Sequence, residues 1–149
     1  MDSNALQKFI TDAHSDILLD DAKHIIDVTR EYAFRAINVA MVQRNWLLGK
    51  RIAGETLNGE DRAEYGTQVI KALSKQLTSL YGSGFTKSNL YQFVQFYKLF
   101  PNIFHTLCGK SGILSWSHYR LLLRVNNDDA REWYAQEALS QNWSVRTLG

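Results

Sequence analysis

The side chains best suited to chemical recognition lie on one side of residues 86–100. Glutamine can pair with adenine in the major groove, serine can bond to a base or a phosphate, and lysine can reach guanine or the backbone. An apolar stripe is predicted on one side of this segment, formed by Leu90, Phe93, Val94, Tyr97 and Phe100. Polar residues stand at helical spacing on the opposite side, and they are Lys87, Ser88, Tyr91, Gln92, Gln95 and Lys98. The pattern is typical of a DNA-reading helix, and it is also the solvated face of any soluble amphipathic helix.

A window without acidic residues surrounds this segment. Between Glu64 and Asp128 the sequence contains only basic charges, which are Lys71, Lys75, Lys87, Lys98, Lys110, Arg120 and Arg124. Because a lysine or arginine that meets a phosphate releases condensed counterions, this window suits a polyanion. We therefore predict that Lys71, Lys75, Lys98, Arg120 and Arg124 contact DNA phosphates. A solvated basic face without a partner is the alternative.

Catalytic chemistry has little support in the sequence. The histidines do not have metal-ligand spacing, and the single cysteine, Cys108, lacks the setting of a nucleophile and excludes an internal disulfide. Gly82 and Gly84 are followed by Phe85, so they do not form a phosphate-binding loop. We expect no catalytic residue, no metal, no cofactor and no small-molecule substrate in this chain.

Two helices joined by a glycine turn must position the recognition side chains. Apolar residues at helical spacing predict the first helix over residues 65–80, and Gly82-Ser83-Gly84 predicts the turn. Thr86 is suited to cap a second helix, which Pro101 would end at Phe100. A helix pair of this kind suggests a helix-turn-helix motif.

Before this pair, an amphipathic arm is expected in the first 13 residues and a long helix from Asp20 or Asp21 to about Glu55. Apolar residues cover more than one stripe of the long helix, so neighbouring helices or a second copy of the chain must bury the extra face. Of these two, we favour a homodimer. Gly49 and Gly54 are expected to weaken the end of this helix.

After the pair, a loop is expected over residues 102–114, and later helices are expected to begin at Ser115, at Asn127 or Asp128, and at Ser144. Four residues of the helix that begins at Asn127 or Asp128 are expected to face inward, namely Trp133, Tyr134, Ala138 and Leu139. With no strand-like alternation, the prediction is an all-α fold. It comprises an arm and long helix over residues 1–61 and a helix-turn-helix core with supporting helices over residues 62–149, which are expected to form one structural unit. No signal peptide or membrane-spanning run is evident, so a cytoplasmic location is expected.

The order of several motifs is similar to a known bacterial family. The sequence contains YGTQVIKALSKQL, GSGFTKSNLYQFVQFYKLFP, LSWSHYRLLLRV, AREWY and NWSVRTL. Together these resemble the N-terminal domain of YhcG-type proteins, over roughly residues 20–149. Such proteins usually join a helical N-terminal domain of uncharacterised function to a C-terminal PD-(D/E)xK nuclease-like domain, which this chain would lack.

A second and weaker similarity is to the helix-turn-helix region of ParB-like partition proteins. It implies a first helix over residues 67–80, a recognition helix over 86–99, and core positions for Trp116, Tyr119, Trp133 and Trp143. The leading hypothesis is a DNA-binding module that positions a separate nuclease-like domain. The alternative is a protein-interaction or oligomerisation module that does not bind nucleic acid.

Overall fold

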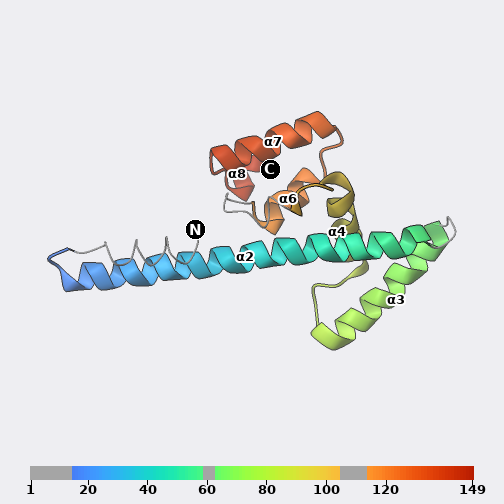
Figure 1. Cartoon of the computed structure of the whole chain (residues 1–149), viewed down its shortest axis with the longest axis horizontal. Helices are drawn as coiled ribbons and strands as arrows, with labels where there is room; N and C mark the ends of the chain where they lie inside the picture. Colours follow the sequence, from blue (N-terminus) through green and yellow to red (C-terminus); the bar gives the residue numbers. More distant parts are fainter. Residues whose placement is uncertain (1–14, 59–62, 105–113) are drawn as a thin grey trace.

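The computed structural model describes residues 15–58, 63–104 and 114–149 (Figure 1). Within these ranges the labelled elements are all helices, which confirms the predicted all-α fold. They are α2 (Leu18–Asn58), α3 (Ala63–Tyr81), α4 (Lys87–Leu99), α6 (Trp116–Leu122), α7 (Asp128–Ser140) and α8 (Val145–Leu148). The expected N-terminal arm, Cys108 and Lys110 lie outside the described residues. No helix in the described ranges is both long and apolar enough to cross a bilayer.

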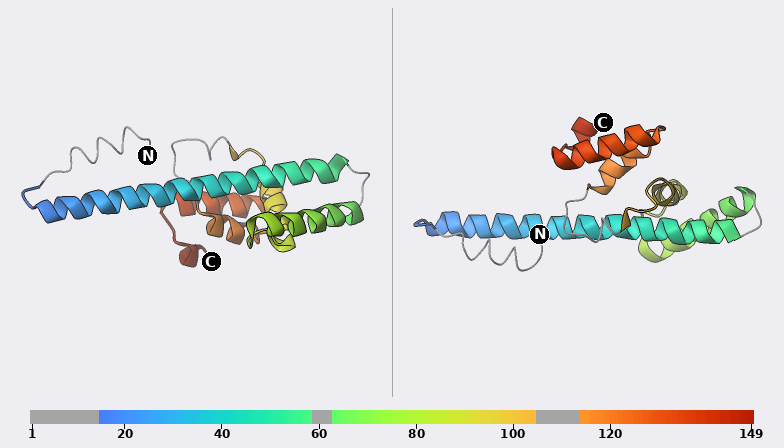
Figure 2. Two further views of the ribbon diagram at one scale, coloured as in Figure 1. Left: turned by 90° about the horizontal axis from the view of Figure 1, so that it is seen from below. Right: turned by 45° about the horizontal axis from the view of Figure 1, so that its top comes forward.

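Helix α2 is the long helix expected from the sequence, and it is slightly longer than predicted. Its 41 residues correspond to about 60 Å at ~1.5 Å per residue. Asp20 and Asp21 stand in the first turn, where the helix dipole favours negative charge. The helix passes through Gly49 and Gly54 without a break. Its N-terminal half projects beyond the other labelled helices in Figure 1 and in both views of Figure 2.

The C-terminal half of α2 packs against α4. At Gly49 the two backbones come so close that an added Cβ would lie 1.9 Å from the carbonyl oxygen of Phe93. Only glycine, which has no Cβ, permits this approach. At the C-terminal end of α4, the buried indole of Trp46 donates a hydrogen bond of 3.0 Å to the carbonyl of Phe100. These contacts fix both the distance between the helices and the end of α4.

The turn between α3 and α4 has the predicted chemistry. Gly82 and Gly84 adopt φ angles of +83° and +110°, which disfavour side chains with a Cβ. The Thr86 hydroxyl accepts a hydrogen bond from the amide of Asn89 and caps α4 as predicted. Ser74 of α3 donates to the carbonyl of Phe85 at 2.7 Å, so the turn is attached to the preceding helix.

The three C-terminal helices begin at the predicted caps. Ser115, Asn127 and Ser144 each accept a hydrogen bond from a backbone amide three residues later. His118 completes a capping box with Ser115, and its Nε2 lies 2.7 Å from the carbonyl of Trp143. The start of α6 is therefore tied to the connection between α7 and α8.

The buried side of α4 joins two hydrophobic clusters. One contains Phe96 and Phe100 with Tyr119 and Leu122 of α6, and the other contains Leu90 and Phe93 with residues of α2 and α3. Tyr97 and Trp116 pack against both clusters. Helix α4 is therefore the central element of the core.

The inward orientation expected for Trp133 and Tyr134 is wrong. Trp133 is 54% exposed and Tyr134 is 38% exposed, and their rings contact each other at a centroid distance of 5.1 Å. The buried side of α7 contains Arg131, Ala135 and Ala138, which follow helical spacing, and the inward position of Ala138 was predicted. The core position implied for Trp133 by the ParB-like similarity is wrong for the same reason.

Candidate nucleic-acid interface

Helix α4 has one buried side and one outer side. Leu90, Phe93 and Val94 of the predicted apolar stripe are buried, and Phe96, which the prediction did not include, is fully buried. The α4 outer side consists of the exposed residues Lys87, Ser88, Tyr91, Gln95 and Lys98. Gln92 was predicted to lie on this outer side with the other polar residues, but it is half-buried. Its enclosed Oε1 has no hydrogen-bond partner among the described residues.

One contact joins the α4 outer side to α3. The Tyr91 hydroxyl lies 3.5 Å from Oγ1 of Thr67, at the long limit of a hydrogen bond. Lys71 follows Thr67 by four residues and Lys75 by eight, and both lysines are exposed. Because residues four apart lie on the same side of a helix, these two lysines continue the α3 edge that begins at Thr67.

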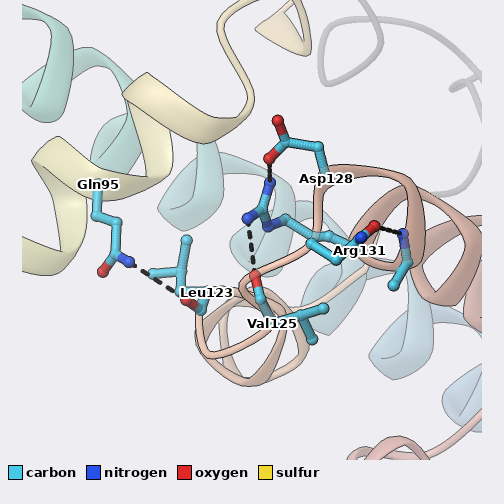
Figure 3. A network of polar contacts seen from close by, with 7 residues as sticks. Gln95, Leu123, Val125, Asp128 and Arg131 are labelled. Atoms are coloured by element: carbon cyan, nitrogen blue, oxygen red, sulfur yellow. Dashed lines mark hydrogen bonds and ion pairs between the residues drawn. The ribbon is translucent and has the colours of Figure 1, made fainter.

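A second contact joins the α4 outer side to the end of α6. The amide nitrogen of Gln95 donates a hydrogen bond of 3.2 Å to the carbonyl of Leu123, as Figure 3 shows. The exposed Arg124 is the next residue, and the exposed Arg120 lies one turn earlier. This bond places the turn that carries Arg124, which follows α6, beside the α4 outer side. Gln95 itself binds the backbone, a role that its spacing in the sequence did not reveal.

The folded surface around Lys98, at the end of α4, contains acidic residues that the acid-free window of the sequence does not. Lys98 lines a surface depression of about 340 Å³ together with Asp128, Arg131 and Glu132 of α7. Both acidic residues lie beyond the acid-free window, and folding brings them beside its last α4 lysine. The positive field is therefore weaker at Lys98, because nearby carboxylates oppose it.

Sequence reasoning did not identify Arg131, which is only 5% exposed. Its guanidinium donates to Asp128 Oδ1 and to the carbonyl of Val125, both at 2.7 Å (Figure 3). The three-residue spacing of Asp128 and Arg131 could have indicated this ion pair, because residues three apart are neighbours on a helix. Arg131 holds the connection between α6 and α7, and this connection includes the turn that carries Arg124.

Comparison with known proteins defines the family. Residues 21–149 match the model of the DUF1016 N-terminal domain. The chain belongs to this family. It is also 35% identical, over 157 aligned residues, to the Escherichia coli (strain K12) protein named "Putative nuclease YhcG". The alignment covers 87% of this chain and 42% of that protein, so the chain spans about two-fifths of its relative's length. No solved structure matches the chain.

The match confirms the resemblance to YhcG-type N-terminal domains. In this DUF1016 N-terminal domain, the described residues contain no group of three or more His, Cys, Asp or Glu side chains placed to hold a metal ion. Burial raises the pKa of Tyr119 to about 12, so this phenol stays neutral at physiological pH. Tyr119 packs between Phe96 and Phe100, which is a structural position.

Proposed function

We propose that this chain is a DNA-binding module that positions a separate nuclease-like domain on its substrate. The α4 outer side would face the DNA groove, with Lys87, Ser88 and Tyr91 nearest the bases. Lys71 and Lys75 of α3, Arg120 of α6 and Arg124 of the turn after α6 would contact phosphates. Phosphate contacts of this kind supply most of the affinity for a nucleic acid.

The observation that carries this proposal is the pair of contacts that flank the α4 outer side. Tyr91 reaches Thr67 on α3, and Gln95 reaches Leu123 at the end of α6. Basic residues from three helices therefore border one row of polar side chains. The opposite side of α4 is buried, so this row is the part of the helix that is accessible to a ligand.

The geometry also changes the roles expected within the row. Gln95 and Gln92 were predicted to read bases, but the first binds the backbone of Leu123 and the second is half-buried. Lys98 lies beside two carboxylates. We therefore place the principal base contacts at the N-terminal end of α4, where helix-turn-helix proteins usually make them.

Fluorescence anisotropy with a labelled DNA duplex tests the proposal. Binding should be measurable at about 50 mM salt and should weaken steeply toward about 200 mM, because counterions are released. Replacing Lys71 and Lys75 together with alanine should lower affinity on every duplex. It should also reduce the slope of log affinity against log salt by about 0.9 for each phosphate contact that is lost.

Lys23→Ala is the matched control, because Lys23 is exposed on the projecting half of α2 among acidic residues. It should leave affinity and salt slope nearly unchanged. The DNA proposal is wrong if no binding is detected at the low salt concentration, or if Lys23→Ala weakens binding as much as the α3 changes do.

The competing function is a protein-interaction module that does not bind nucleic acid. The observation that favours it is the projecting half of α2, where Leu19 and Ile37 are 66% and 57% exposed. A patch of exposed apolar side chains on one element usually marks a contact surface. The same anisotropy experiment separates the two functions, because a purely protein-binding module leaves the labelled duplex free.

A further inference from the structure

Helix α2 carries an apolar row with the spacing of a coiled coil, which begins on the projecting half and continues onto the packed half. Alternating steps of three and four residues define what we call the outer stripe, which contains Leu19, Ala22, Ile26, Thr29, Ala33, Ala36, Ala40, Gln43 and Leu47. All of these residues are exposed or half-buried. A mean spacing of 3.5 residues keeps one row of side chains against a second helix over many turns.

The outer stripe faces away from the core of the molecule. Ala33 is nine residues from Val42, and Ala40 is nine residues from Gly49. Nine residues are about two and a half turns, so the two members of each pair point in opposite directions. Val42 and Gly49 are buried on the side that packs against α4. A second helix can therefore lie along the outer stripe without displacing α4.

The side chains of the outer stripe suit close helix packing. The three alanines at 33, 36 and 40 let another backbone approach closely, as small residues do at helix interfaces. The one hydroxyl in the stripe is already satisfied, because Thr29 Oγ1 lies 2.8 Å from the carbonyl of Ile25 and 3.0 Å from that of Ile26. Burial of Thr29 would therefore not leave an unpaired donor.

The two ends of the outer stripe are complementary in charge. Exposed Asp16 and Asp20 lie at the N-terminal end, and exposed Arg44, Lys50 and Arg51 lie at the C-terminal end. Between the ends, the basic Lys23, Arg30 and Arg35 alternate with the acidic Asp27 and Glu31, so the middle carries charges of both signs. At the C-terminal end Arg51 is already paired with Glu55 at 3.0 Å. Parallel pairing of two copies would place acid beside acid and base beside base. Antiparallel pairing would place the acidic end of each copy beside the basic end of the other.

The two ends are also complementary in shape. Ala40, Gln43, Arg44, Leu47 and Leu48 line a shallow depression of about 380 Å³ at the C-terminal end. At the N-terminal end Leu19 is 66% exposed. When Asp16 of one copy lies beside Arg44 of the other, Leu19 falls opposite Gln43 within this depression, and Ile26 falls opposite Ala36. Of these pairs, the large Ile26 meets the small Ala36, which suits knobs-into-holes packing.

We propose that the outer stripe binds a second copy of this chain in antiparallel orientation. The surface extends from Leu19 to Leu47, about 42 Å at ~1.5 Å per residue. This self-association does not depend on the proposed DNA binding, because the outer stripe and the α4 outer side are different surfaces.

Sedimentation equilibrium of the whole 149-residue chain tests the self-association. We expect a dimer at about 100 µM, and a chain that stays monomeric at that concentration overturns the proposal. Ala36→Glu places a charge within the outer stripe and should raise the dimer dissociation constant on the order of 100-fold. Ala72→Glu, the same change at an exposed position of α3, should leave it unchanged. Equal effects of the two changes would also overturn the proposal.

Disulfide trapping tests the orientation in a Cys108→Ser background. A mixture of Ile26→Cys and Ala36→Cys chains should form a cross-linked dimer of the two kinds. Ile26→Cys alone should cross-link poorly, because the two copies of residue 26 lie about ten residues, or ~15 Å, apart along the axis. Efficient cross-linking of Ile26→Cys alone would show a parallel pair and overturn the antiparallel assignment.

Discussion

At the scale of single residues, Gly49 is the position where the chain has the least freedom to change. An added Cβ would lie 1.9 Å from a backbone oxygen of α4, and a backbone atom cannot turn aside as a side chain can. Alanine is normally about 1 kcal/mol better than glycine within a helix. Here the steric cost exceeds that gain.

We predict that Gly49→Ala lowers the free energy of unfolding by at least about 2 kcal/mol, because α2 and α4 must separate. Gly54→Ala is the matched control, since nothing lies within 4 Å of its added Cβ. That change should raise stability by up to about 1 kcal/mol. Urea unfolding measures both values, and equal shifts in the two variants would contradict the packing argument.

Tyr119 provides a prediction about pH. Its pKa is raised to about 12 by burial, whereas an unfolded tyrosine titrates near 10. The unfolded chain therefore releases this proton first, so the stability from Tyr119 is full below about pH 10 and is lost as pH rises toward about 12. The loss is on the order of 2 kcal/mol.

Tyr119→Phe should remove this component of the pH dependence while leaving the other titrating groups in place. Comparing urea unfolding of the two chains at several pH values isolates the difference. The interpretation fails if both chains lose the same free energy over this interval.

At the scale of helices, Gln95 joins α4 to the end of α6. We predict that Gln95→Ala lowers the free energy of unfolding by about 1 kcal/mol, because the carbonyl of Leu123 loses its donor. Gln76→Ala on the exposed side of α3 should change stability little. If Gln95→Ala instead leaves stability unchanged and alters preference among DNA duplexes, this glutamine reads bases as the sequence suggested.

Helix boundaries were largely predictable because their signals are local. Thr86, Ser115, Asn127 and Ser144 cap helices through contacts three residues away, and such spacing is visible in the sequence. The packing role of Gly49 was not predictable, because Phe93 is distant in the sequence. Burial likewise depends on residues that are distant in the sequence. For this reason the prediction left the fully buried Phe96 out of the apolar stripe and placed the exposed Trp133 in the core.

The candidate site was predictable to a similar degree. The exposure of Lys87, Ser88 and Tyr91 followed from the period of the apolar stripe. The binding of Gln95 to Leu123 and the carboxylates beside Lys98 depend on how α6 and α7 pack. A stretch of sequence without acidic residues can still lie beside carboxylates in the folded protein, because folding brings in residues from outside that stretch.

At the scale of the whole molecule, α2 divides into a packed half and a projecting half. We predict that amides in residues 18–38 exchange hydrogen faster than those in residues 42–53 when the protein is dilute, because few tertiary contacts protect them. Protection of the first group should increase with protein concentration if the outer stripe pairs. Hydrogen exchange with mass spectrometry measures both groups, and uniform protection at every concentration would contradict this division.

The close approach at Gly49 also has a mechanical consequence. Since α2 is continuous and held tightly at that point, the helix can act as a lever with a fixed pivot. Leu18 is 31 residues away, about 46 Å along the axis, so a tilt of about 10° at the pivot would move it by ~8 Å. A small adjustment of α2 against α4 is thus amplified into a displacement larger than one helical turn at the far tip.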